Sequence, residues 1–150
     1  MVRKTHKGKF RPRNPGKYLG DVSNIVFRSG WELRTFKYLD ENSNVQAWNS
    51  EEIVVAYISP MDGKPHRYFP DVYAEIRDKS GSIKKYLLEI KPEAETRPPE
   101  PPRRITEAYI SKVGTFGVNI AKWEAARKYC QEKGWIFKLI TEKDLGLRSK

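Results

Sequence analysis

Two short acidic motifs, one strand apart, constrain the fold of this chain more than any other feature. Phe69-Pro70-Asp71 lies within 68–76, a segment typical of a β-strand. Leu88-Glu89-Ile90-Lys91 ends a second such segment, 83–91. A turn rich in Asp, Ser and Gly joins the two segments at 78–81. We therefore expect a hairpin that brings the acids of the two motifs side by side.

Glu89 and Lys91 should point to one face of this hairpin, because side chains alternate along a strand. Pro70 has no amide hydrogen, so the first strand should lie at a sheet edge or bulge just before Asp71. Two carboxylates and a lysine would then meet beside apolar core, which suits a divalent cation with oxygen ligands. The alternative is a solvated ion pair between Glu89 and Lys91, since Glu-x-Lys is common in exposed strands.

A third acid, Glu32, is predicted to face the same core. Residues 27–32 open a predicted helix that runs to about Glu41, with an apolar stripe of leucine and phenylalanine. Glu32 falls on that stripe, where a carboxylate needs a partner such as a cation to offset its desolvation. Ser29-x-x-Glu32 is also a capping box, in which the acid hydrogen-bonds an amide at the helix start. Both interpretations stay open at this point.

The order of these residues resembles that of the PD-(D/E)XK nucleases, and in particular their TnsA-like branch. In that layout a helix glutamate is followed by a strand aspartate and a strand Glu-x-Lys, and the likeness spans roughly 21–147. The resemblance implies metal-assisted hydrolysis of phosphodiester bonds with Mg²⁺, or Mn²⁺ as its substitute, and no small-molecule organic cofactor. It implies that Asp71, Glu89 and Glu32 hold the metal and that Lys91 orients the attacking water. These four are the predicted catalytic residues.

The remaining segments predict an α/β fold with a mixed sheet of about five strands flanked by helices. Extended segments at 45–48 and 53–58 precede a turn at 59–65, and a last strand is expected at 135–140. A second helix is predicted from an N-cap at Asn119 to a C-cap at Gly134. A proline-rich loop at 92–104 should be irregular, and it would fence a DNA channel, dock on a partner protein or act as a passive linker. A short helix should start at 141–144.

Charge predicts a polyanionic partner. The net charge is +10, and no long apolar run suggests a membrane, so double-stranded DNA is the expected partner through its phosphates. No acid precedes Asp21, which predicts a basic flexible arm over 1–20 and a nuclease domain over 21–150. The alternative for the arm is a solubilising tail. The predicted DNA-binding residues are Arg3, Lys4, Lys7, Lys9, Arg11, Arg13, Lys17, Arg28, Arg103, Arg104 and Lys122, the last with a solvated helix face as its alternative.

Taken whole, the chain is similar to the head completion nucleases of T-even-type tailed bacteriophages. The likeness rests on the basic arm, the three acidic motifs and Asn119-x-x-Lys122-Trp123. It implies trimming of packaged DNA late in assembly, portal-vertex proteins of the phage head as partners, and a location in the host cytoplasm or the virion. Two alternatives are a non-catalytic DNA-binding protein of the capsid vertex and a TnsA-like transposition endonuclease. An inward-facing set of Glu32, Asp71, Glu89 and Lys91 distinguishes an enzyme from a binding protein.

Overall fold

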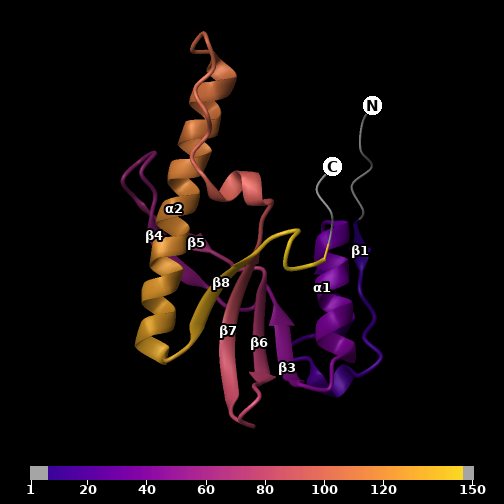
Figure 1. The fold of residues 1–150 in the computed structure, drawn as a ribbon. Helices are drawn as coiled ribbons and strands as arrows, with labels where there is room; N and C mark the ends of the chain where they lie inside the picture. The colour runs from indigo at the N-terminus through magenta and orange to yellow at the C-terminus, as the bar shows by residue number, and fades with distance from the viewer. Residues whose placement is uncertain (1–6, 147–150) are drawn as a thin grey trace.

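A four-stranded mixed sheet forms the centre of the molecule. The computed structural model describes residues 7–146. The sheet has the order β3 (Val45–Ser50), β6 (Val72–Arg77), β7 (Ile83–Ile90) and β8 (Ile136–Ile140), as Figure 1 shows. Neighbouring strands are antiparallel except β7 and β8, which are parallel. This confirms the predicted α/β fold and the β6–β7 hairpin, with four strands in the main sheet rather than about five.

The missing fifth strand is explained by a break at Pro70. The strand expected over 68–76 is interrupted: Tyr68 ends β5 (Pro65–Tyr68), β6 starts at Val72, and β5 pairs with β4 (Val55–Ile58) in a separate two-stranded sheet. Pro70 is fully buried at the break and offers no amide hydrogen to a ladder. Asp71 therefore lies between two strands rather than within one.

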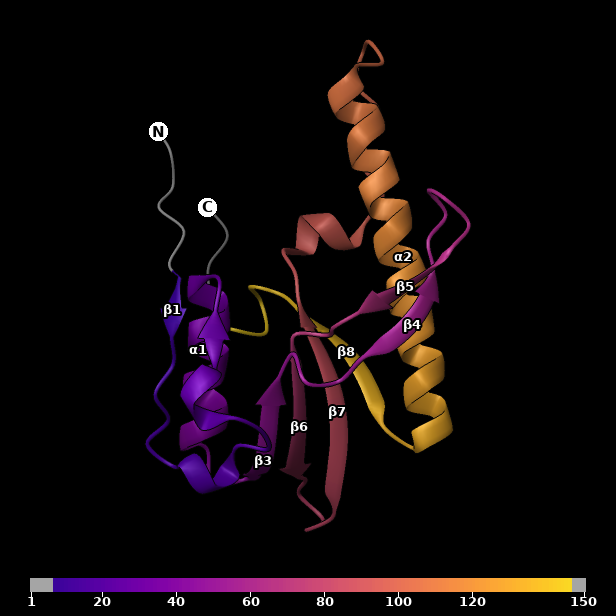
Figure 2. The same cartoon turned by 180° about the vertical axis from the view of Figure 1, so that it is seen from behind.

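Two helices cover opposite faces of the main sheet. The helix α1 (Gly30–Glu41) packs its buried Phe36 and Leu39 with Val72 and Leu88 of the sheet. The other face presents Tyr73 and Leu87 to α2 (Glu107–Lys133), which buries Trp123, Ala126 and Cys130 against it. Figure 2 shows the two helices on either side of β3, β6 and β7. The predicted alternation along 83–91 is confirmed, because Leu87 and Leu88 belong to different clusters.

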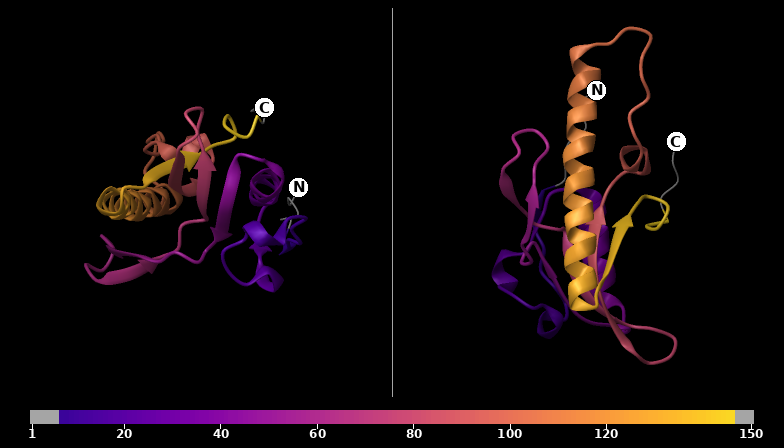
Figure 3. Two further views of the ribbon diagram at one scale, coloured as in Figure 1. Left: turned by 90° about the horizontal axis from the view of Figure 1, so that it is seen from below. Right: turned by 90° about the vertical axis from the view of Figure 1, so that its left-hand side faces the viewer.

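The second helix starts thirteen residues earlier than predicted. Thr106, not Asn119, is its N-cap, and the Thr106 hydroxyl accepts a hydrogen bond from the Tyr109 amide (3.1 Å). Figure 3 shows that the N-terminal half of α2 extends beyond the sheet, where it needs no continuous apolar stripe. Gly114 lies against Met61 of the β4–β5 turn. The C-cap was predicted correctly, since Gly134 adopts a left-handed conformation with φ 73°.

Two loop predictions differ from the structure in detail. The proline-rich loop contains a single turn of 3₁₀ helix, Glu93–Thr96, before it becomes irregular. The expected helix at 141–144 is a hydrogen-bonded turn within the described residues, in which the Thr141 amide donates to the Asp144 carboxylate (2.9 Å). No helix between residues 7 and 146 is long and apolar enough to cross a membrane.

The basic N-terminal segment is packed on the body of the protein from residue 7 onward, in contrast to the expected flexible arm. The strand β1 (Gly8–Lys9) pairs with β2 (Val26–Phe27). Phe10 is 7% exposed and meets the rings of Phe36 and Trp48 edge-on, with centroids 5.8 and 6.0 Å away. Residues 1–6, with the predicted DNA-binding residues Arg3 and Lys4, lie outside the described part of the chain.

Polar contacts with the end of α1 hold the same segment. The buried Asp40 carboxylate accepts hydrogen bonds from the amides of Arg13 (2.8 Å) and Asn14 (3.0 Å). The Lys17 ammonium donates to the carbonyls of Leu39, Asp40 and Asn42. These carbonyls have no partner inside the helix, and a cation there also offsets the negative end of the helix dipole. Lys17 thus has a structural role that charge counting does not reveal.

Phe10→Ala is expected to lower the free energy of unfolding by about 2–4 kcal/mol, because it leaves a cavity between α1 and Trp48. Urea unfolding followed by circular dichroism measures this loss. Phe69→Ala is the matched control, since the Phe69 side chain is 44% exposed and should change the stability little. Equal stabilities for the two variants would show that the segment around Phe10 is not part of the core.

Candidate metal centre

Three acids stand in a row across adjacent strands at one edge of the main sheet. Ser50 pairs with Val72, and Val72 pairs with Leu88. Because these pairs are antiparallel, one more residue in each direction aligns Glu51, Asp71 and Glu89. The Glu51 amide donates to the Asp71 carbonyl (3.3 Å), which continues the ladder past the end of β3. Strand register thus gathers acids that are 38 positions apart in the sequence.

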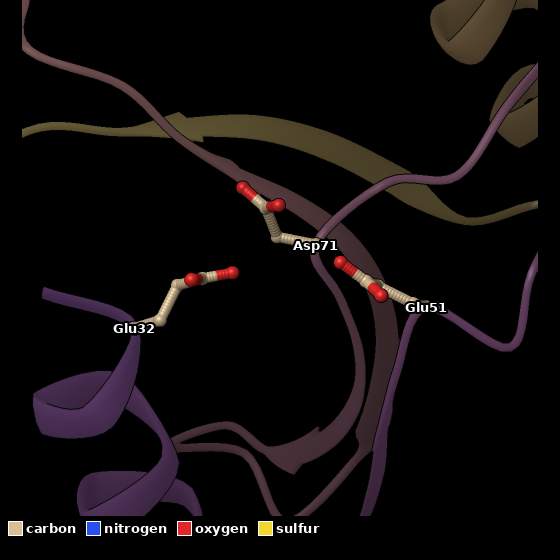
Figure 4. Close-up of side chains that lie close together, drawn as sticks. All are labelled: Glu32, Glu51 and Asp71. Atoms are coloured by element: carbon tan, nitrogen blue, oxygen red, sulfur yellow. The ribbon is translucent and has the colours of Figure 1, made fainter. Parts of the chain in front are cut away.

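Glu32 joins this row from the first turn of α1. Its carboxylate oxygen lies within 4.8 Å of carboxylate oxygens of Glu51 and Asp71, and Figure 4 shows the three side chains converging on one space. Ser29 caps the helix by accepting from the Glu32 amide (3.1 Å), and Glu32 accepts from the Arg28 amide (2.6 Å). The capping contact and the acidic cluster therefore coexist, because a carboxylate has two oxygens and several lone pairs to share.

Glu51 was not predicted from the sequence. The predicted strand ended at Trp48, two residues short of the real end of β3, so Glu51 was not aligned with Asp71. Glu51 adopts φ 57°, a left-handed conformation that is uncommon for a residue other than glycine. Its carboxylate forms an ion pair with the exposed Arg28 guanidinium. The sequence feature that could have identified Glu51 is the acidic pair Glu51-Glu52, which lies between the predicted extended segments 45–48 and 53–58.

Burial and mutual repulsion set the electrostatics of the site. Burial, and then the charge of Glu89, raise the pKa of Asp71 to about 8, against a hydrogen bond from the Ile90 amide (2.7 Å) and the charge of Lys91. Burial also raises the pKa of Glu32, assisted by Asp71 and opposed by the Arg28 amide. Carboxylates held this close in a partly dry site repel one another, and the charges of Arg28 and Lys91 offset this repulsion only in part, since the pKa values of Asp71 and Glu32 stay raised. The chemistry of the donor set therefore fits a hard divalent cation.

Glu89 faces the α2 side of the sheet and is also short of partners. It is 8% exposed, and its Oε1 atom is buried with no hydrogen bond within the described residues. The buried Tyr68 hydroxyl is equally without a partner there, and the charge of Glu89 helps raise the pKa of Tyr68. The Lys122 ammonium lies 5.6 Å from the centre of the Tyr68 ring and 5.8 Å from that of Tyr57. The Tyr68 side chain thus lies between Lys122 and Glu89.

The structure brings the four predicted catalytic residues to one region. Glu32 and Asp71 share the cluster with Glu51, while Glu89 and Lys91 act electrostatically on Asp71. The Lys91 amide donates to the Ile140 carbonyl (2.8 Å), so β8 fixes the backbone beside it. Lys122 is half-buried beside Tyr57 and Tyr68 rather than on a solvated face. Arg103 and Arg104 are exposed in the loop before α2.

Exposed bases of the N-terminal segment lie along α1, with Lys7 near its start and Arg13, which forms an ion pair with Glu41, near its end. Gly8 pairs with Phe27, so Lys7 is opposite Arg28, the residue whose amide binds Glu32. Lys7 and Arg28 are exposed, as are Lys9, Arg11 and Arg13. Figure 1 shows β1 beside α1 at the end of the molecule where β7 leaves the sheet. A positively charged surface therefore adjoins the acidic cluster.

Two comparisons with known proteins bear on this site. Residues 42–142 match the family described as TnsA-like endonuclease N terminal. The chain is also 38% identical, over 144 residues, to the head completion nuclease of Enterobacteria phage T4, and the alignment covers 93% of each protein. Asp71, Glu89 and Lys91 fall inside the family match, whereas Glu32 precedes it and falls on the helix that completes the site.

Proposed function

From the premise that this chain belongs to the TnsA-like endonuclease family, and that it is a homologue of a phage head completion nuclease, we propose that it hydrolyses phosphodiester bonds of DNA with a divalent metal ion. Its role would be to process packaged phage DNA so that filled heads can join tails. The observation that carries the metal-dependent mechanism is the convergence of Glu32, Glu51 and Asp71 beside the buried Glu89.

The ligand set suits Mg²⁺, with Mn²⁺ as its substitute. Asp71 would be the shared ligand, because it lies between Glu51 and Glu89 in the row and near Glu32. The orphaned Oε1 atom of Glu89 supports this assignment, since a buried carboxylate oxygen is costly without a partner. When bound, a divalent ion supplies Lewis-acid polarisation of the phosphate and lowers the pKa of water.

Lys91 would orient the nucleophile and stabilise charge that develops on the phosphate. Its charge lowers the pKa of Asp71, which indicates that the ammonium acts within the same site. Its place two residues after Glu89, on the same side of the strand, keeps both groups on one face. Proton handling of this kind typically contributes about 10²–10⁴-fold to a rate.

The exposed bases near α1 would hold the DNA backbone. Lys7, Lys9, Arg11, Arg13 and Arg28 can contact phosphates without reading the sequence. Proteins of the head vertex would bring the enzyme to the DNA end. Lys17 is left out of this set because its ammonium already donates to three helix carbonyls.

Plasmid cleavage tests the proposed function. Supercoiled and linear plasmid should be cut in the presence of Mg²⁺ and left intact with EDTA. Products from the supercoiled form distinguish nicking from double-strand cleavage, and shortening of the linear form detects trimming of ends. DNA binding without cleavage under every metal condition would favour a non-catalytic vertex protein instead.

Glu51→Gln is expected to weaken Mn²⁺ binding by about tenfold or more, because it removes one ligand charge from the cluster. Isothermal titration calorimetry of the DNA-free protein gives the affinity directly. The matched control is Glu52→Gln, which removes the neighbouring exposed carboxylate and should leave the affinity unchanged. If both variants bind Mn²⁺ like the native protein, Glu51 is not a ligand.

Tyr68→Phe is expected to lower metal affinity or turnover by about 10–100-fold, the range for groups that orient a metal ligand. The change removes only the hydroxyl beside Glu89, so the ring stays packed under Lys122. Tyr57→Phe is the control, because its ring also meets Lys122 but its hydroxyl does not act on Glu89. In Tyr68→Phe, the metal affinity from calorimetry and the steady-state cleavage rate should both fall. Native values of both quantities would exclude a role for Tyr68 in positioning Glu89.

A further inference from the structure

A second site lies beside the candidate metal centre, between the proline-rich loop and α2. A cavity of about 510 Å³ is lined on the helix side by Lys112, Phe116 and Asn119, and on the loop side by Glu95, Arg97 and Glu100. We call it the α2 cavity. Its volume falls in the range of about 300–1,000 Å³ found for small-molecule sites. Figure 3 shows the loop running alongside the projecting half of α2.

The charges around the α2 cavity disfavour a phosphate as its occupant. Two acids, Glu95 and Glu100, are matched by two bases, Arg97 and Lys112, so the lining has no net charge. An anion would be repelled by the acids, whereas a neutral ligand with both donors and acceptors can use every one of these groups. The lining thus suits a polar, uncharged and flat ligand.

The side-chain chemistry of Asn119 and Phe116 favours a nucleobase as the ligand of the α2 cavity. Asn119 is 8% exposed, and it lines the cavity. An amide offers one acceptor and two donors, which match the edge of a base. Phe116 is half-buried in the same wall and can stack on a base through its ring face.

The α2 cavity is close enough to the metal centre to receive a nucleotide of the DNA being cut. Asn119 is one helical turn, about 4.5 Å along the axis, from Lys122. Lys122 contacts the ring of Tyr68, which adjoins Glu89. On the other side, the loop that lines the cavity leaves the sheet directly after Lys91.

We propose that the α2 cavity binds one unpaired nucleotide of single-stranded DNA, next to the phosphodiester bond that is cut. This inference rests on the proposed nuclease function and adds a substrate preference to it. A duplex with a single-stranded extension, or a frayed end, would bind better than a fully paired blunt end. The base would stack on Phe116 and hydrogen-bond Asn119, while its phosphates remain outside the cavity.

The test measures DNA binding in EDTA, so that no cleavage occurs. Fluorescence anisotropy compares a blunt duplex with the same duplex carrying a three-nucleotide extension of either polarity. The native protein should bind one extended duplex about tenfold tighter than the blunt duplex, the effect expected of one stacked base. A 2-aminopurine placed in the extension should be quenched when it stacks on Phe116.

Substitutions in the cavity wall assign the preference to this site. Phe116→Leu and Asn119→Leu should each remove most of the preference while leaving blunt-duplex affinity unchanged, and Phe116→Trp should restore stacking. Val113→Leu is the control, since Val113 is exposed on the same helix outside the cavity. Melting temperatures near that of the native protein establish that each variant is folded.

The outcomes separate this inference from the proposed function. No preference in the native protein, or a preference that both leucine variants retain, overturns the nucleotide site even if plasmid is still cleaved. Absence of Mg²⁺-dependent plasmid cleavage overturns the proposed function, whatever the extension does to binding. A preference lost in both leucine variants and kept in Val113→Leu supports the nucleotide site.

Discussion

Replacing Asp71 with asparagine is expected to abolish metal-dependent cleavage and, at the same time, to stabilise the metal-free protein. Cleavage should fall by about 10³-fold or more, because the change removes the central ligand charge of the acidic row. Asparagine keeps an oxygen that can accept from the Ile90 amide, so the local fold is retained. The free energy of unfolding at neutral pH should rise, because the native Asp71 carboxyl, whose pKa is raised to about 8, must take up a proton on folding and asparagine need not.

The raised pKa of Asp71 predicts the direction in which stability changes with pH. The folded-state pKa of Asp71, about 8, is raised above the ordinary value of 3.8. Between these values the folded protein binds more protons at this group than the unfolded protein does, so stability falls as pH rises from about 4 to about 8. In EDTA the native protein should therefore lose roughly 3–4 kcal/mol more than D71N between pH 5 and pH 8.

Urea unfolding at the two pH values, in EDTA, measures the difference. Glu52→Gln removes an exposed acid near the same edge and should follow the native protein at both pH values. Added Mn²⁺ should stabilise the native protein more than D71N, because only the native site keeps the central ligand charge. Parallel pH profiles for the native protein and D71N would contradict the raised pKa, and a D71N enzyme that cuts DNA would end the metal-site proposal.

Lys91→Met is expected to reduce turnover by about 10²–10⁴-fold while the protein still binds Mn²⁺. Methionine keeps much of the side-chain length and removes the charge that would assist the attacking water and the phosphate. Binding should persist because Lys91 is not an oxygen ligand and the carboxylates remain.

Single-turnover cleavage and calorimetry separate the two effects of Lys91→Met. The control is Lys85→Met on the same strand, where the lysine is exposed and its residue pairs with Glu75 rather than with a member of the acidic row. Native turnover by Lys91→Met would remove Lys91 from the catalytic set. Loss of Mn²⁺ binding with retained fold would show that its role is to set the charge of the site instead.

Local sequence patterns were sufficient to predict the elements that are stabilised by contacts between residues close together in the sequence. The apolar stripe of α1, its Ser29 cap, the β6–β7 hairpin and the Gly134 C-cap each depend on residues a few positions apart. The start of α2 could not be found in this way. Its N-terminal half projects beyond the sheet, and the periodicity that predicts helices comes from burial on one face.

The packing of the N-terminal segment was also not predictable from local sequence. Its composition is that of a mobile arm, yet two residues, Phe10 and Tyr18, enter the core, and the Asp40 carboxylate binds two of its amides. Composition averages over a window and therefore misses a few anchoring side chains. Tertiary contacts alone decided that residues 7–20 pack on α1.

For the site, the sequence by itself determined the chemistry: two motifs with carboxylates and a lysine, a helix glutamate, and the order that links them to a known nuclease layout. Only the tertiary structure decided which acids meet. Glu51 entered the row because β3 runs two residues further than its pattern suggests, and Asp71 was freed for the site by the break at Pro70. Register between strands depends on hydrogen bonds between distant segments, and no local pattern in either segment contains that information.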